Sequence, residues 1–239
     1  MASITALHFR GYRVQGAALT QLGWFAAGAA IAFLIPFVFS SVLDLGHDLY
    51  YLVYFTLAAV FLVTYVQATG LDVVAFFTRN WRWSLILGVV ASAFLVFRIL
   101  NAEESTPHPN GLYFVFEIGW RGVVYGTVDA LLLTAFPLAI AYAVVGGKLD
   151  TLARRGGYLL LTIGMVWIIT ATYHLGYEQF REDGVAGPET GNTIISLPAI
   201  VTANPAGAVV AHAAMHMTAV THAYETDLYL PPQTFVEED

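Results

Sequence analysis

The sequence predicts an all-α protein, a polytopic transmembrane helix bundle with about six spans. Of its 239 residues, 58% are hydrophobic and only 11% are charged, whereas a soluble domain carries about 25% charged residues. The mean hydropathy is +0.67. Apolar runs near the length of about 20 residues that a spanning helix needs recur along the chain. We therefore expect a single integral membrane domain over residues 1–239, in contact with the lipid bilayer.

Short polar segments divide the chain into six apolar spans. The expected spans cover residues 21–42, 49–69, 83–100, 112–145, 158–180 and 193–221. Basic residues precede the first span, as in a signal peptide, but its apolar run is longer than a signal core and has no clear small-residue cleavage site. We therefore expect it to be retained, with a kink at Pro36.

The last apolar region differs from the others because prolines interrupt it. Pro198 and the pair Asn204–Pro205 break the run, and its first part is too short to span a bilayer comfortably. Irregular backbone at this depth needs cover from protein or water. We expect either a broken hairpin or a short, tilted or re-entrant segment, and the number of crossings after residue 190 stays open.

The charges of the connecting segments alternate in sign. The N-terminal segment and the loops 78–82 and 146–156 are basic, whereas the loops 43–48, 101–110 and 181–190 are acidic or neutral. Cytoplasmic loops carry an excess of Lys and Arg. The pattern therefore predicts a cytoplasmic N-terminus and supports the first five spans.

Composition excludes several kinds of site. The chain has no cysteine, so it has no disulfide, no thiolate nucleophile and no cysteine-ligated metal or iron–sulfur cluster. Its net charge of −7 is the opposite of what a nucleic-acid-binding protein carries.

The fourth expected span carries three ionisable residues, Glu117, Arg121 and Asp129. Such groups cost a few kcal/mol each inside a membrane unless they are paired or hydrated, so they are candidates for a functional site. Glu117 and Arg121 are four residues apart and share one helix face, where they can form an ion pair. The alternatives are that this pair is structural, and that Asp129 pairs with Arg98 or Arg121.

Histidines in the last two spans suggest a metal site. His212 and His216 are four residues apart and point the same way from a helix, so both can bind one ion. On adjacent antiparallel spans, His174 is expected at a depth similar to that of Glu117. We predict that Glu117, His174, His212 and His216 can hold zinc, with His174 and Glu178 as a further helical pair. The alternative for His174 is a hydrogen bond to a carbonyl.

The run FEIGWRGVVYG places Glu117 four residues before Arg121, which Gly122 follows. This arrangement resembles the first motif, EExxxR followed by Gly, of the CAAX-processing-type intramembrane proteases (the CPBP family), with Ile118 after the glutamate. His174 resembles the histidine of the family's FxxxH motif, with Thr170 in place of Phe.

The third motif of that family, HxxxN, is similar to AHAAMHM, where His212 is followed by His216 in place of Asn. The resemblance covers residues 114–217 and implies an intramembrane protease. It implies that Glu117 is the base that activates water, with Arg121, His174 and His212 as its catalytic partners. His216 would replace the asparagine that holds the oxyanion.

The leading function is therefore a membrane-embedded hydrolase with a Glu/His site, metal-bound or metal-free, that acts on a peptide or lipid substrate. A second hypothesis is a zinc hydrolase like those of the ceramidase and adiponectin-receptor superfamily, which also has an HxxxH helix. A third is a non-enzymatic subunit or scaffold of a membrane complex, with partner proteins and with haem or a pigment bound through histidines. A fourth is a proton or solute pathway lined by Glu117, Arg121 and Asp129.

Overall fold

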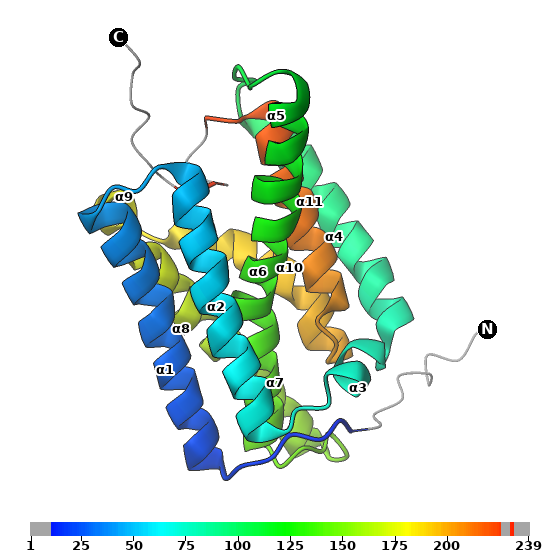
Figure 1. Ribbon diagram of the computed structural model, residues 1–239. Coiled ribbons are helices and arrows are strands. Elements are labelled where there is room, and N and C mark those ends of the chain that lie inside the picture. Colours follow the sequence, from blue (N-terminus) through cyan, green and yellow to red (C-terminus); the bar gives the residue numbers. More distant parts are fainter. Residues whose placement is uncertain (1–10, 226–229, 232–239) are drawn as a thin grey trace, which may run out of the picture.

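The computed structural model of the protein describes residues 11–225 and 230–231, and all regular secondary structure within these ranges is helical. Figure 1 shows the long helices packed side by side as a bundle. Five helical segments are long and apolar enough to cross a membrane. The predicted class, an all-α polytopic bundle that contacts the lipid bilayer, is thus confirmed.

The first two spans form an antiparallel pair. Helix α1 (Ala18–Pro36) continues into a π-helical turn, η2 (Phe37–Val42). Pro36 has no backbone N–H and so cannot donate the hydrogen bond that would continue a regular α-helix. This accounts for the change from α-helix to π-helix at this residue. Helix α2 (His47–Thr69) ends at Gly70, whose φ of 57° is the left-handed conformation common after helices.

A short helix and a long one follow. Helix α3 (Val73–Thr78) is capped by Asp72, whose side chain accepts a hydrogen bond from the Ala75 N–H at 2.9 Å. Helix α4 (Trp81–Ala102) is the third spanning segment. Only 22% of its most apolar stretch is buried, so most of this helix faces lipid.

The fourth spanning segment is the centre of the bundle. It runs without a break from Gly111 to Val144 through α5 (Gly111–Glu117), η3 (Ile118–Val124), α6 (Tyr125–Ala130), η4 (Leu131–Ala135) and α7 (Phe136–Val144). Of its most apolar stretch, 72% is buried, against 39% or less in the other four. Two π-helical turns, η3 and η4, lie within it, and Pro137, which removes a backbone donor, lies two residues after the second.

The fifth span lies nearer the N-terminus than the sequence predicts. Helix α8 (Leu152–Leu175) begins within the basic loop, because the Thr151 side chain accepts the Arg154 N–H at 3.2 Å. It ends before Gly176, and a separate short helix, α9 (Glu178–Asp183), follows. The predicted bounds 158–180 are therefore wrong at both ends. His174 and Glu178 do not share a helix, so the predicted helical pair does not form.

The last apolar region is a hairpin of two helices, α10 (Ala186–Thr202) and α11 (Ala206–His222). The break falls at Asn204–Pro205, as predicted, and the Asn204 carboxamide oxygen accepts the Ala206 N–H at 2.8 Å. Pro198 lies inside α10, so the predicted break at this proline is wrong. Helix α10 also begins seven residues before the expected residue 193, because the polar stretch before it is helical as well.

The two helices of the hairpin run in opposite directions through the bundle. The end of α10 meets the loop before α4, where the Asn80 carboxamide donates to the Thr202 carbonyl at 3.0 Å. The end of α11 meets the loop after α4, where the Thr106 N–H donates to the His222 carbonyl at 3.0 Å. Each helix has 17 residues, or about 26 Å, near the lower limit for a spanning helix.

Candidate metal centre

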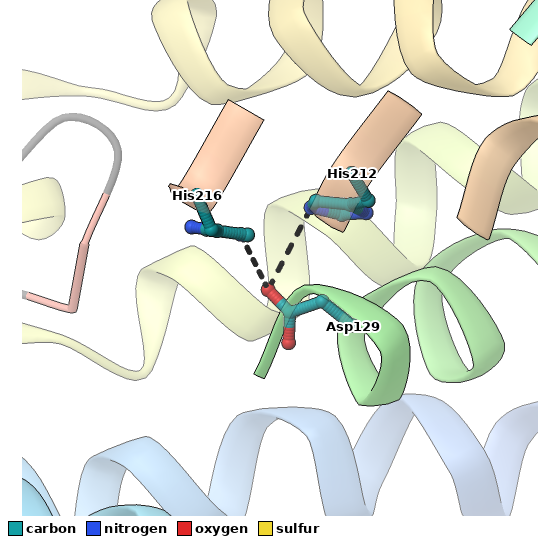
Figure 2. Close-up of side chains that lie close together, drawn as sticks. All are labelled: Asp129, His212 and His216. Carbon is teal, nitrogen blue, oxygen red and sulfur yellow. Dashed lines mark ion pairs between the residues drawn. The ribbon is translucent and has the colours of Figure 1, made fainter. Parts of the chain in front are cut away.

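Three ionisable side chains meet in the middle of the bundle. Asp129 comes from α6, and His212 and His216 are one turn apart on α11. The Oδ2 atom of Asp129 lies 3.8 Å from Nε2 of each histidine, and Figure 2 shows this one oxygen aimed at both rings. All three side chains are at least 96% buried. They are a group that could hold a metal ion.

Glycines bring the two helices close enough for this meeting. Gly122 and Gly126 are four residues apart and face α11. A Cβ atom on Gly126 would lie 2.7 Å from Cα of Ala213, and one on Gly122 would lie 2.8 Å from Cγ of Met217. Small residues at this spacing let two membrane helices approach backbone to backbone. Asp129, one turn beyond Gly126, therefore reaches the histidines of α11.

Tyrosines surround the buried carboxylate. The Tyr54 hydroxyl donates to Oδ1 of Asp129, which leaves Oδ2 facing the histidines. The Tyr125 ring packs against His216 with its centroid 4.5 Å from that of the imidazole. From Tyr125 a chain of hydroxyl contacts leads away through Tyr173 and Tyr177, with oxygen–oxygen distances of 2.8 Å. The carboxylate is thus surrounded by hydroxyl groups and aromatic rings.

The group lies at the inner wall of a cavity of about 500 Å³. His174 of α8 also lines this cavity. Its Nδ1 atom lies 2.8 Å from the Thr170 carbonyl, as the hydrogen-bonded alternative predicts. Because a carbonyl only accepts, Nδ1 carries the proton and Nε2 keeps its lone pair. His174 therefore keeps an imidazole lone pair within the residues that line this cavity.

The dimensions and the chemistry of the group both suit a cation. Two ligand atoms of a tetrahedral zinc ion at about 2.1 Å lie about 3.4 Å apart; both carboxylate–imidazole distances are 3.8 Å, and the ligand atoms of the three residues lie within 4.8 Å of one another. No Lys or Arg among the described residues forms an ion pair with Asp129. Among the described residues, none forms a hydrogen bond with the buried Nδ1 atom of His212. A buried carboxylate needs a compensating charge, which a bound cation supplies.

Glu117 and Arg121 form a second polar cluster, at the α5 end of the central segment. Nη1 of Arg121 donates to Oε2 of Glu117 at 2.9 Å, and both side chains are at most 2% exposed. The Tyr224 hydroxyl donates to the same carboxylate oxygen at 3.0 Å, and its ring centroid lies 4.3 Å from the guanidinium carbon. Burial raises the pKa of the Tyr224 hydroxyl to about 12, so it stays protonated.

The predicted site residues therefore divide between two places. His174, His212 and His216 line one cavity, whereas Glu117 and Arg121 pair with each other twelve and eight residues before Asp129, about 18 and 12 Å away along the helix. The carboxylate that faces His212 and His216 is that of Asp129, whereas the sequence analysis predicted Glu117. Asp129 faces these histidines rather than Arg98 or Arg121. The sequence feature that pointed to Asp129 as a site residue was the presence of a carboxylate within an apolar spanning segment. Comparison of the chain with models of known protein families finds no match, and comparisons with curated proteins and with solved structures find none either.

Proposed function

We propose that the protein is a membrane-embedded zinc-dependent hydrolase whose ion is held by Asp129, His212 and His216. The observation that carries this proposal is the buried carboxylate that faces two imidazoles at 3.8 Å on the inner wall of a cavity. Two histidines and one carboxylate are a common catalytic zinc set, in which the fourth position belongs to water.

The ligand types favour zinc over other biological cations. Calcium and magnesium prefer sets made of oxygen atoms alone, and copper(I) prefers sulfur. Ferrous iron also uses two histidines and a carboxylate, so metal content is part of the test below. Bound zinc lowers the pKa of its water to about 7 and makes hydroxide available near neutral pH.

We assign the proton transfer to His174, which lines the same cavity as the metal group. Its lone pair is on Nε2, because Nδ1 donates to the Thr170 carbonyl. In the proposed reaction Nε2 takes a proton from water, and the water oxygen attacks the substrate carbonyl. The bond from the carbonyl carbon to the leaving nitrogen or oxygen then breaks, and the leaving group takes the proton from His174. Tyr54 holds Asp129 in orientation throughout.

The position of Glu117 supports this proposal over the metal-free Glu/His protease that the CPBP resemblance implies. A glutamate base must lie within hydrogen-bonding reach of the reacting water. The described partners of the Glu117 carboxylate are instead Arg121 and Tyr224. The Glu117–Arg121 pair is therefore assigned a structural role, which was the alternative that the sequence left open.

The experiment that tests the function measures hydrolysis by the purified protein in lipid nanodiscs. Ester and amide lipids and membrane peptides serve as substrates, before and after a chelator removes metal. We expect activity that chelation abolishes, that zinc restores and that His174→Gln lowers about 100-fold or more. Activity that survives complete removal of metal would contradict the proposal. A Soret or pigment band in the visible spectrum would favour the haem or pigment alternative.

A further inference from the structure

The cavity that contains the metal group has a buried end and an exposed end. Asp129, His212 and His216 are each about 3% exposed and form the buried end. The exposed lining residues lie on α4 and on the first turns of α10, and they are Phe94, Arg98, Ala186, Gly187 and Thr190. The cavity therefore opens between the second half of α4 and the start of α10.

The α4 side of the opening carries exposed apolar side chains. Phe94 is 49% exposed and Phe97 is 63% exposed on the α4 side. Further along α10, Leu197 and Val201 are 46% and 52% exposed. These two α10 residues lie seven or more positions beyond Thr190, so the apolar flank at the opening itself is that of α4, and such a flank is what a lipid-facing surface carries in a membrane protein. A molecule that enters between α4 and α10 therefore passes an exposed apolar surface on the α4 side.

One cation stands at this opening. Arg98 is the only Lys or Arg among the described residues that line the cavity. It lies four residues before the end of α4, about one turn from the polar loop that follows. Its guanidinium can bind a phosphate or carboxylate in bidentate fashion. The walls between Arg98 and the histidines include Leu95, Leu133, Ile195 and Met215, which suit an acyl chain.

We propose that the substrate is an acyl-chain amphiphile with an anionic headgroup. It enters from the bilayer between α4 and α10 and is anchored by Arg98, with its apolar part inside the cavity. This inference rests on the proposed function for the placement of a scissile ester or amide carbonyl at the metal group. The binding step needs no catalysis, so it is tested separately with a ligand that cannot be cleaved.

The absence of cysteine from the chain makes site-directed thiol labelling direct. Thr190→Cys places a thiol at the opening. Thr64→Cys is the matched control, because both threonines are exposed helical residues whose hydroxyl bonds only the carbonyl four residues earlier. Each variant is labelled with a methanethiosulfonate reagent in phosphatidylcholine nanodiscs. The probes are dodecyl phosphate, dodecanol, which lacks the charge, and inorganic phosphate, which lacks the chain.

We expect dodecyl phosphate to slow labelling at position 190 about tenfold and to leave position 64 unchanged. Dodecanol and inorganic phosphate should give little protection. Replacing Arg98 by Gln should weaken the protective affinity about tenfold or more, since a charge-assisted contact contributes about 1.5–3 kcal/mol. Arg82→Gln, at the other end of α4, should have no effect.

The inference would be overturned by no protection from dodecyl phosphate, by equal protection from dodecanol, or by protection that Arg98→Gln leaves intact. Equal protection by inorganic phosphate would show a free-anion site and would overturn it too. Zinc content is measured in the same samples. Bound zinc without protection defeats the amphiphile inference alone, whereas protection without zinc defeats the proposed hydrolase and leaves the amphiphile site standing.

Discussion

Asp129 carries the proposed chemistry because of the two different partners of its carboxylate. Oδ1 accepts the Tyr54 hydroxyl and Oδ2 faces His212 and His216. The first contact fixes the orientation of the carboxylate, and the second supplies a negatively charged oxygen to a cation. A carboxylate that is oriented by one hydrogen bond while its other oxygen faces ligands is the arrangement expected of a metal site.

Asp129→Asn should therefore weaken zinc binding with little effect on folding. The carboxamide keeps the size of the side chain and an acceptor for Tyr54, but it lacks the charge. We expect the zinc affinity, measured by competition with a chromophoric chelator, to fall about 100-fold or more. Asp150→Asn, at an exposed loop carboxylate, is the control and should bind as the unmodified protein does. Unchanged affinity in Asp129→Asn would remove this residue from the site.

Glu117→Ala should act on stability rather than on metal. It leaves the buried Arg121 charge without its partner, which costs about 3–5 kcal/mol. The double variant Glu117→Gln, Arg121→Met removes the charge as well and should recover much of that loss. Denaturant unfolding in detergent micelles measures both. If Glu117→Ala lost zinc at full stability, Glu117 would belong to the metal site, as the sequence alone predicts.

The sequence alone predicts most of the residues at the site but not their grouping. The spacing of His212 and His216 is visible on any helix, whereas topology placed His174 at the depth of Glu117. Which carboxylate of the fourth span joins them depends on the rotation of that span against α11. Glycine contacts and two π-helical turns set this rotation, and a hydrophobic pattern does not reveal it.

At the scale of elements, the contact between α6 and α11 determines whether the site forms. Gly126 is the position of closest approach, because an added Cβ would lie 2.7 Å from Cα of Ala213 and 2.9 Å from the His212 carbonyl oxygen. Both atoms belong to the backbone, which cannot rotate aside as a side chain can. The helices must then separate, and Asp129 moves away from the histidines.

Gly126→Ala should consequently destabilise the protein by about 1–3 kcal/mol and weaken zinc binding at the same time. Gly164→Ala is the matched control within α8, since nothing lies within 4 Å of the added atom. It should be neutral, or stabilising by up to about 1 kcal/mol from helix propensity. Thermal unfolding and zinc titration of both variants check this. If both variants behaved alike, close packing of α6 on α11 would not support the site.

The spanning helices could be predicted from the sequence, but the residues at which some of them begin could not. The five long spans follow directly from apolar runs of sufficient length. The start of α8 depends on the Thr151 cap, and the start of α10 depends on a polar stretch that becomes helical beside α8. Hydropathy identifies the segments that lie in lipid, but it does not show how far a helix extends beyond its apolar run.

At the scale of the whole molecule, the hairpin α10–α11 determines the side on which the chain leaves the bundle. Helix α11 ends beside the loop after α4, where the Glu225 N–H donates to the Thr106 hydroxyl at 3.1 Å. Residue 225 and the loop 103–110 therefore lie at the same end of the bundle, opposite the loop after α7. With the alternating loop charges, this end is predicted to face away from the cytoplasm.

Single cysteines test this topology in intact membranes. Glu104→Cys and Glu225→Cys should react with a membrane-impermeant thiol reagent added from outside, whereas Lys148→Cys should react only after the membrane is opened. The unmodified chain, which has no cysteine, is the blank. Labelling of residue 225 together with residue 148 would mean that the last region crosses only once.

The measurement that tests the account most directly is the zinc content of the purified protein by elemental analysis. We predict about one zinc per chain, lost both in the His212→Ala, His216→Ala double variant and in Asp129→Asn, and retained in the folded Glu117→Gln variant. Protein that binds no zinc when zinc is supplied, or variants without these three ligands that keep it, would contradict the central claim.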